Sequence, residues 1–225
     1  MKKVLFACIT ISLLVISCSK NDPTPAAAEK YMTITAGSKW TYDVITNPGT
    51  PGATTVADTV TVSATDTTIE PGTANQRIYR IFNHKNGSED YYNITSSDYY
   101  RFQVLPLNNL QIQNLYLKDN AAVGASWSQT LSVTVPGFPT PIPITVTNSV
   151  TEKALTRTVN GNVYNDVINV KTNITSSGLP PGTIVSDIKS YFAPKAGLIE
   201  GDYKITVALI SVDVNTQTLI KTFTP

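Results

Sequence analysis

The sequence has almost no cysteine and almost no histidine. Its 225 residues include two cysteines, Cys8 and Cys18, and a single histidine, His84. Both cysteines lie near the start, so the rest of the chain can form no disulfide, thiolate metal site or cysteine nucleophile. One imidazole cannot build a histidine-based metal site, and the Gly-x-Ser-x-Gly motif of serine hydrolases is absent. We therefore expect no metal, no cofactor and no catalytic residue.

The chain also lacks an excess of charge. It carries 17 Lys and Arg against 16 Asp and Glu, which gives a formal net charge of +1. No stretch is basic enough to attract a polyanion. Nucleic acid is therefore not an expected partner.

Acidic residues and the histidine lie near predicted turns. His84 comes just before Asn86-Gly87, Glu89-Asp90 comes just after it, and Glu200-Gly201-Asp202 separates two predicted strands. A glycosidase needs two carboxylates about 5 to 10 Å apart across a sugar, and spacing in the sequence does not supply that distance. We interpret all of these side chains as solvated, and we expect that the protein is not an enzyme.

The start of the chain has the layout of a secretory signal. Lys2 and Lys3 precede an uncharged, largely apolar run from Val4 to Ile16. This run is shorter than the roughly 20 apolar residues that a membrane-spanning helix needs. Val15 stands three residues before Cys18, and a small residue directly before it, which resembles the lipobox of bacterial lipoproteins.

The lipobox resemblance implies a signal peptide over residues 1–17 and a lipid on Cys18. Each buried methylene contributes about 0.8 kcal/mol, so two or three acyl chains attach a protein to a membrane almost permanently. The resemblance also implies a location at the outer membrane, on its periplasmic face or on the cell surface. Cleavage at a neighbouring site is the alternative, and it would leave Cys18 without lipid.

Beyond the anchor, the sequence predicts a tether and a β domain. Residues 18–32 are interpreted as the lipidated cysteine and a tether, because they are polar or proline-containing and show no alternation. Residues 33–225 are predicted to form an antiparallel β domain, since apolar and polar residues alternate with a period of two, as in Trp40, Tyr42 and Val44. The predicted strands are 40–44, 56–63, 78–83, 90–95, 99–105, 110–117, 131–135, 144–150, 163–174, 184–192, 203–209 and 219–223.

Two Asn-Gly dipeptides predict hairpin turns. Asn86-Gly87 separates the predicted strands 78–83 and 90–95, and Asn160-Gly161 leads into the strand 163–174. Both residue types tolerate the positive φ of tight turns. The predicted fold class is all-β, with an extended or curved antiparallel sheet that is half-barrel or sandwich-like.

A weak internal repeat includes both tryptophans of the chain. Gly37-Ser38-Lys39-Trp40 is echoed by Gly124-Ala125-Ser126-Trp127. The repeat predicts two similar units, 36–120 and 121–225. Chance similarity between threonine-rich strands is the alternative.

A second resemblance joins the two ends of the predicted domain. Gly37-x-x-Trp40-x-Tyr42 stands near its start, and Tyr191-Phe192-Ala193-Pro194-x-x-Gly197-Leu198-Ile199 stands near its end. Together they resemble uncharacterised exported lipoproteins from Bacteroidota. This resemblance implies an extended or curved antiparallel sheet, and it implies no activity.

Tyrosines form two adjacent pairs, Tyr91-Tyr92 and Tyr99-Tyr100, with Arg101 beside the second. On a strand, one ring of such a pair faces each side of the sheet. We expect one ring of each pair in the core and its neighbour in an exposed stripe. Tyr92, Tyr100 and Arg101 are therefore candidate ligand-binding residues, because tyrosine offers a flat apolar face with a polar tip. The alternative is that tyrosine simply favours strands.

Three functions are compatible with these patterns. The first is a lipid-anchored cell-envelope protein that acts as a non-enzymatic binding or structural module, with the membrane as one partner. The second is a carrier of an apolar ligand in a curved sheet, with Ile205, Val207 and Leu209 lining unfilled volume. The third is a glycan-binding protein that uses Tyr92 or Tyr100. A protein partner is compatible with the first and third.

Overall fold

The computed structural model describes residues 30–70, 72–105, 110–134, 139–208 and 212–225. Residues 1–17, Cys18 and Leu209 lie outside the described residues. The part that is described contains no helix that is long and apolar enough to cross a membrane. The described residues form twelve strands: β1 Lys39–Thr46, β2 Thr54–Ile69, β3 Arg77–His84, β4 Glu89–Thr95, β5 Asp98–Leu105, β6 Leu110–Lys118, β7 Ser126–Val133, β8 Ile142–Val159, β9 Asn162–Ser176, β10 Ile184–Ala193, β11 Gly197–Val207 and β12 Val212–Thr224.

All twelve strands belong to one antiparallel sheet. Their order is β6-β5-β4-β3-β2-β1-β12-β11-β10-β9-β8-β7. The sheet therefore consists of two six-stranded meanders, the N-terminal meander (β1–β6) and the C-terminal meander (β7–β12), which pair along β1 and β12. The prediction of an all-β fold with a curved antiparallel sheet is confirmed.

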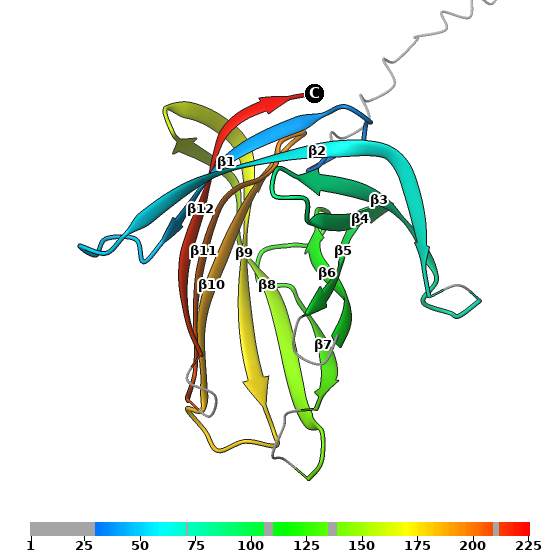
Figure 1. The fold of residues 1–225 in the computed structure, drawn as a ribbon, viewed down its shortest axis with the longest axis vertical. Coiled ribbons are helices and arrows are strands. Elements are labelled where there is room, and N and C mark those ends of the chain that lie inside the picture. Colours follow the sequence, from blue (N-terminus) through cyan, green and yellow to red (C-terminus); the bar gives the residue numbers. More distant parts are fainter. Residues whose placement is uncertain (1–29, 71, 106–109, 135–138, 209–211) are drawn as a thin grey trace, which may run out of the picture.

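The sheet curves until its two edge strands, β6 and β7, approach each other. The main-chain carbonyl of Leu115 in β6 accepts hydrogen bonds from Trp127 Nε1 at 2.6 Å and from Asn148 Nδ2 at 3.0 Å. Figure 1 shows β8 to β12 running along the long axis, with β1 and β2 crossing the upper end. Register shifts such as the one between Tyr191 and Phe192 help the strands bend, since a bulge increases the local twist.

The two sequence motifs of the Bacteroidota resemblance contact each other at this upper end. Trp40 Nε1 donates to the main-chain carbonyl of Ala196 at 2.6 Å, and the Tyr42 hydroxyl donates to that of Leu198 at 3.2 Å. The second motif forms the end of β10, its turn and the start of β11. Trp40 is also stacked on Phe82 and is fully buried. The motifs thus close one end of the sheet.

Residues just before β1 complete this closed end. The main-chain N–H of Tyr31 donates to the Tyr99 hydroxyl at 2.9 Å, and the Tyr31 hydroxyl donates to the Asp166 carbonyl at 2.6 Å. Met32 packs against the buried core there. Ordered packing therefore begins before Thr33, where the sequence placed the start of the domain.

The two segments of the predicted repeat adopt the same turn. Gly37 and Gly124 have φ values of 89° and 86°. The Gly37 N–H donates to the Val62 carbonyl at 2.9 Å, and the Gly124 N–H donates to the Val150 carbonyl at 2.8 Å. In both cases the N–H of that valine donates back to the residue after the glycine. The two units 36–120 and 121–225 thus begin alike, and their duplication stays a prediction.

Both predicted hairpins are present. Asn160 and Gly161 have φ values of 47° and 80°, so the turn between β8 and β9 uses positive φ at both positions, as predicted. In the turn between β3 and β4, Gly87 has a φ of 86° but Asn86 does not have a positive φ. That hairpin is closed by the His84 N–H donating to the Ser88 carbonyl at 2.9 Å.

Candidate functional site: a cavity inside the curved sheet

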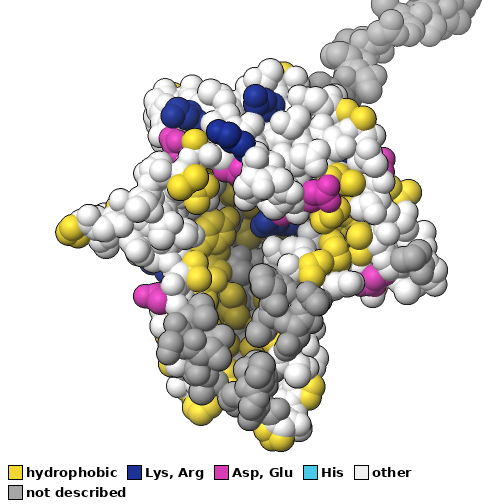
Figure 2. Space-filling view, in the orientation of Figure 1, with side chains coloured by type: hydrophobic (Ala, Val, Ile, Leu, Met, Phe, Trp, Pro, Cys, Tyr) yellow, Lys and Arg dark blue, Asp and Glu magenta, His cyan; other side chains and the backbone are white. Residues whose placement is uncertain are grey.

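The concave face of the sheet encloses a cavity of about 700 Å³. Figure 2 shows it as a hollow with hydrophobic side chains on its walls. Alternation along β11 places Tyr203, Ile205 and Val207 toward the cavity, while Lys204 and Thr206 are exposed on the outer face. The prediction that these residues share one side of the strand is therefore confirmed for Tyr203, Ile205 and Val207.

Aliphatic side chains from the C-terminal meander form one large part of the lining. They come from β7, β8, β9 and β10 at the end of the cavity away from Trp40. They include Leu131, Val133, Ile142, Ile144, Ile174 and Ile184. A cavity of this volume with mainly apolar walls has the size and character of small-molecule binding sites.

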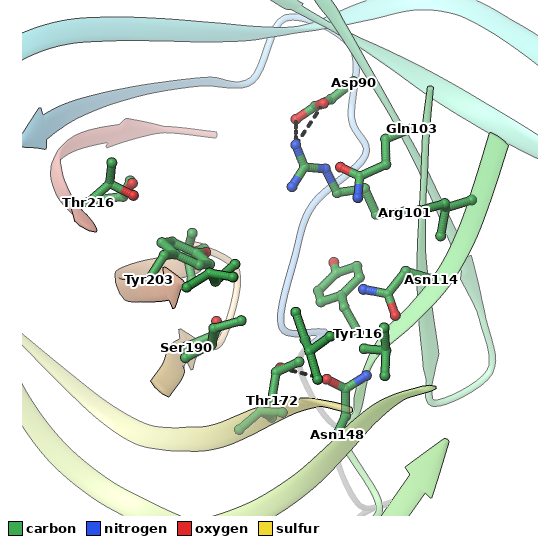
Figure 3. Close-up of a pocket in the computed structure, with 18 of the residues that line it drawn as sticks. Asp90, Arg101, Gln103, Asn114, Tyr116, Asn148, Thr172, Ser190, Tyr203 and Thr216 are labelled. Atoms are coloured by element: carbon green, nitrogen blue, oxygen red, sulfur yellow. Dashed lines mark hydrogen bonds and ion pairs between the residues drawn. The ribbon is translucent and has the colours of Figure 1, made fainter. Parts of the chain in front are cut away.

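Charged residues of the lining all come from the N-terminal meander. They are Asp58 on β2, His84 on β3, Asp90 on β4 and Arg101 on β5, which we call the charged cluster. The described residues that the C-terminal meander contributes include no acidic or basic side chain. Its polar contributions are uncharged, and Figure 3 shows several of them across the cavity from Arg101: Thr172, Ser190, Tyr203 and Thr216.

The charged cluster is a continuous chain of contacts. His84 Nδ1 lies 2.6 Å from an Asp58 carboxylate oxygen, and His84 Nε2 lies 3.2 Å from an Asp90 carboxylate oxygen. Arg101 Nη2 donates to both Asp90 oxygens at 2.9 Å. The Tyr92 hydroxyl donates to the same carboxylate at 3.3 Å. Asp90 therefore accepts from three different side chains.

The charges of the cluster are set by these contacts. Burial alone would raise the pKa of Asp90, but the hydrogen bond from His84 and the positive charge of Arg101 outweigh it and lower that pKa to about 2. The hydrogen bond to Asp90 raises the pKa of His84; burial opposes this rise, and the contact with Asp58 adds to it. Asp90 is therefore ionised at neutral pH, and its charge is compensated by Arg101.

Tyrosines supply uncharged donors around the cluster. Burial raises the pKa of Tyr42, Tyr92, Tyr116 and Tyr203, so their hydroxyls stay protonated. Tyr203 can lie flat along β11 because Gly201 has no side chain. A Cβ at Gly201 would lie 2.6 Å from the Tyr203 ring.

The expectation that the turn-flanking ionisable residues are solvated was wrong for three of them. The side chains of His84 and Asp90 are only 18% and 14% exposed, and they face the cavity. Glu200 is also buried and forms an ion pair with Arg157 at 2.6 Å. Alternation along the strand could have indicated that a charged residue faces the cavity. Asp58 and Val60 are two residues apart, so their side chains lie on the same side of β2.

The structure brings two of the three candidate ligand-binding residues together. Tyr92 and Arg101 line the cavity, and the Arg101 guanidinium lies 5.9 Å from the Tyr92 ring centroid. Tyr100 is on the opposite face of β5, beneath the guanidinium of Arg77 at 3.9 Å. One ring of each tyrosine pair faces each side, as predicted, but Tyr92 and Tyr100 do not share an exposed stripe. Reasoning from sequence missed Gln103 and Asn114, which face the cavity beside Arg101 (Figure 3).

No three His, Cys, Asp or Glu side chains in the described part of the chain could together hold a metal ion. Comparison of the chain with family models, with curated proteins and with solved structures finds no match. The cavity itself is therefore the basis for assigning a function.

Proposed function

We propose that this protein binds an apolar small molecule inside its curved sheet, as a non-enzymatic, lipid-anchored protein of the cell envelope. The observation that supports binding is the cavity of about 700 Å³ between well-formed walls. Protein interiors are packed about as densely as organic crystals, and ligand sites have volumes in this range. An open volume of this size therefore favours a ligand-binding role. The anchor rests on the Val15-Ile16-Ser17-Cys18 sequence.

The lining favours an apolar ligand over a sugar. Aliphatic side chains such as Leu131, Ile144 and Ile205 cannot satisfy the many hydroxyls of a glycan. An alkyl chain gives up no hydrogen bonds when it packs against these side chains, and each methylene removed from water contributes about 0.8 kcal/mol. About ten methylenes would thus supply roughly 8 kcal/mol before the entropy cost of binding is subtracted.

The alternation of β11 offers a direct test with a matched control. Ile205→Trp would project a larger side chain into the cavity and occupy part of it, whereas Thr206→Trp would place the same ring on the outer face. Binding of N-phenyl-1-naphthylamine, a neutral fluorescent apolar probe, would be titrated with each variant. We expect at least a tenfold loss of probe affinity for Ile205→Trp, which corresponds to about 1.4 kcal/mol, and less than about a twofold change for Thr206→Trp.

Two outcomes would contradict the proposal. One is that the unmodified protein does not bind the probe. The other is that the two tryptophan variants bind it equally well, which would place the probe on the outer surface. Circular dichroism of both variants checks that the sheet has formed.

A further inference from the structure

The charged cluster indicates the chemistry of the ligand more closely than the apolar walls do, because it limits what the polar end of the ligand can be. This step rests on the proposed function, since it concerns the ligand of the same cavity. In the described lining, Asp58, His84, Asp90 and Arg101 are the only ionisable side chains besides the tyrosines. The state of these four groups therefore decides which head group is tolerated.

The charge of Arg101 is already compensated. Its Nη2 donates to both oxygens of Asp90 at 2.9 Å, and Asp90 also receives contacts from His84 and Tyr92. An anionic head group would be drawn to Arg101 and repelled by Asp90 at nearly the same distance. It would leave water without gaining a net electrostatic attraction.

Arg101 nevertheless has hydrogen-bonding capacity that the protein does not use. Both contacts with Asp90 involve Nη2, and Nη1 makes no hydrogen bond within the described residues. The side chain is still 40% exposed, and it projects into the cavity (Figure 3). A guanidinium carries five N–H donors, so it can donate to a further oxygen while remaining paired with Asp90.

On the side toward β6, the neighbours of Arg101 are uncharged and polar. Gln103 on β5 and Asn114 on β6 point into the cavity beside it (Figure 3). The Tyr116 hydroxyl is kept neutral by burial. Amides and phenols form good hydrogen bonds with neutral oxygens and do not offset a full charge. Beyond this wall the lining becomes aliphatic toward Leu131 and Ile205.

We propose that the ligand is an uncharged amphiphile with one polar end, an alcohol, ester or amide oxygen that accepts hydrogen bonds from Arg101, with its apolar chain against the aliphatic walls. Asp90 acts as the specificity-determining residue, because it cancels the charge of Arg101 without using all of its donors. Free fatty acids are discriminated against because Asp90 opposes the attraction of Arg101. Alkylamines are discriminated against because Arg101 opposes the attraction of Asp90, although the chains of both fit equally well.

The test uses three ligands that differ only at the head group. Decanol, decanoate and decylamine compete at neutral pH with bound N-phenyl-1-naphthylamine on the unmodified protein. We expect decanol to displace the probe at a concentration at least about tenfold lower than either charged analogue requires. Equal or stronger displacement by decanoate would overturn this inference, while probe binding would still support the proposed function. If the probe does not bind, both fail.

An isosteric variant tests the role assigned to Asp90. Asp90→Asn keeps the shape of the side chain but releases the charge of Arg101, so decanoate should gain at least about tenfold relative to decanol. Asp66→Asn is the matched control, because Asp66 pairs with Arg80 at 2.6 Å and neither residue lines the cavity. The control should leave the order of the three ligands unchanged. An unchanged ratio of decanoate to decanol affinity in folded Asp90→Asn would remove Asp90 from this role, and if that variant does not fold, the order on the unmodified protein decides the inference.

Discussion

The two meanders build the same cavity from different chemistry. The N-terminal meander contributes Asp58, His84, Asp90 and Arg101, whereas the described lining from the C-terminal meander is aliphatic or uncharged and polar. Both meanders have six strands, and both begin with a glycine turn followed by a tryptophan on the first strand. One wall thus holds all the charged side chains of the described lining and the other holds none, which suits an amphiphile whose polar end lies at the first wall.

The largest expected difference between the meanders lies in their tryptophans. Trp40 is 1% exposed and is stacked between Phe82 and Phe223, whereas Trp127 is half-buried. We expect Trp40→Ala to lower the free energy of unfolding by about 3 to 5 kcal/mol and Trp127→Ala by roughly half as much. Urea denaturation measures both. Equal losses would contradict this difference between the two tryptophans.

The charged cluster should make the free energy of unfolding depend on pH in the acidic range. The pKa of Asp90 is about 2 in the folded protein, below its ordinary value of 3.8, so its contribution is present above about pH 4 and is lost as the pH falls toward 2. The loss amounts to about 2 kcal/mol. His84 does not alter this window, because its raised pKa keeps it protonated throughout.

The variant Asp90→Asn isolates this term. The difference in unfolding free energy between the unmodified protein and Asp90→Asn should shrink as the pH is lowered from 4 to 2. Urea denaturation at several pH values measures it. A difference that is constant over this range would mean that Asp90 does not have a depressed pKa.

A smaller effect is expected on the neutral wall of the C-terminal meander. In Gly201→Ala the new Cβ would meet the Tyr203 ring at 2.6 Å, so the ring must turn within the cavity. We expect a loss of about 1 kcal/mol in stability and a several-fold change in probe affinity. Gly52→Ala is the control, since a Cβ there has no atom within 4 Å and the φ of Gly52 is not positive. An equal response of both variants would contradict the placement of Tyr203.

The smallest effect is expected on the outer face of the N-terminal meander. Tyr100→Leu removes the ring beneath Arg77, a contact of the kind that contributes about 0.5 to 1 kcal/mol at exposed sites. Probe affinity should stay within about twofold of the unmodified value. A large loss of binding would mean that the ligand site includes the outer face as well as the cavity.

Much of the strand pattern follows from the sequence, because alternation is a local property. Trp40, Tyr42 and Val44 face the cavity together, and Asn160-Gly161 forms the predicted turn. Strand ends are less accurate: β7 begins at Ser126, before the predicted start at residue 131, since the threonine and serine residues around Trp127 give a weak apolar signal.

The charged cluster could not be assembled from local patterns. Its members lie on four strands, and their contacts depend on pairings such as Phe82 with Asp90 and Tyr92 with Arg101. Turn-flanking positions are usually solvated, so the sequence alone predicts a solvated His84. Closure of the sheet also depends on long-range events, the pairing of β1 with β12 and the hydrogen bonds at the Leu115 carbonyl.

A crystal structure with 2-bromodecan-1-ol, a decanol that carries bromine on its second carbon, would test the central claim most directly. The anomalous signal of bromine locates the polar end of the ligand without bias. The account predicts a single strong peak inside the cavity, beside Arg101, Gln103 and Asn114. A peak on the outer face of the sheet, or a bound molecule whose bromine lies among the aliphatic side chains near Ile205, would contradict it.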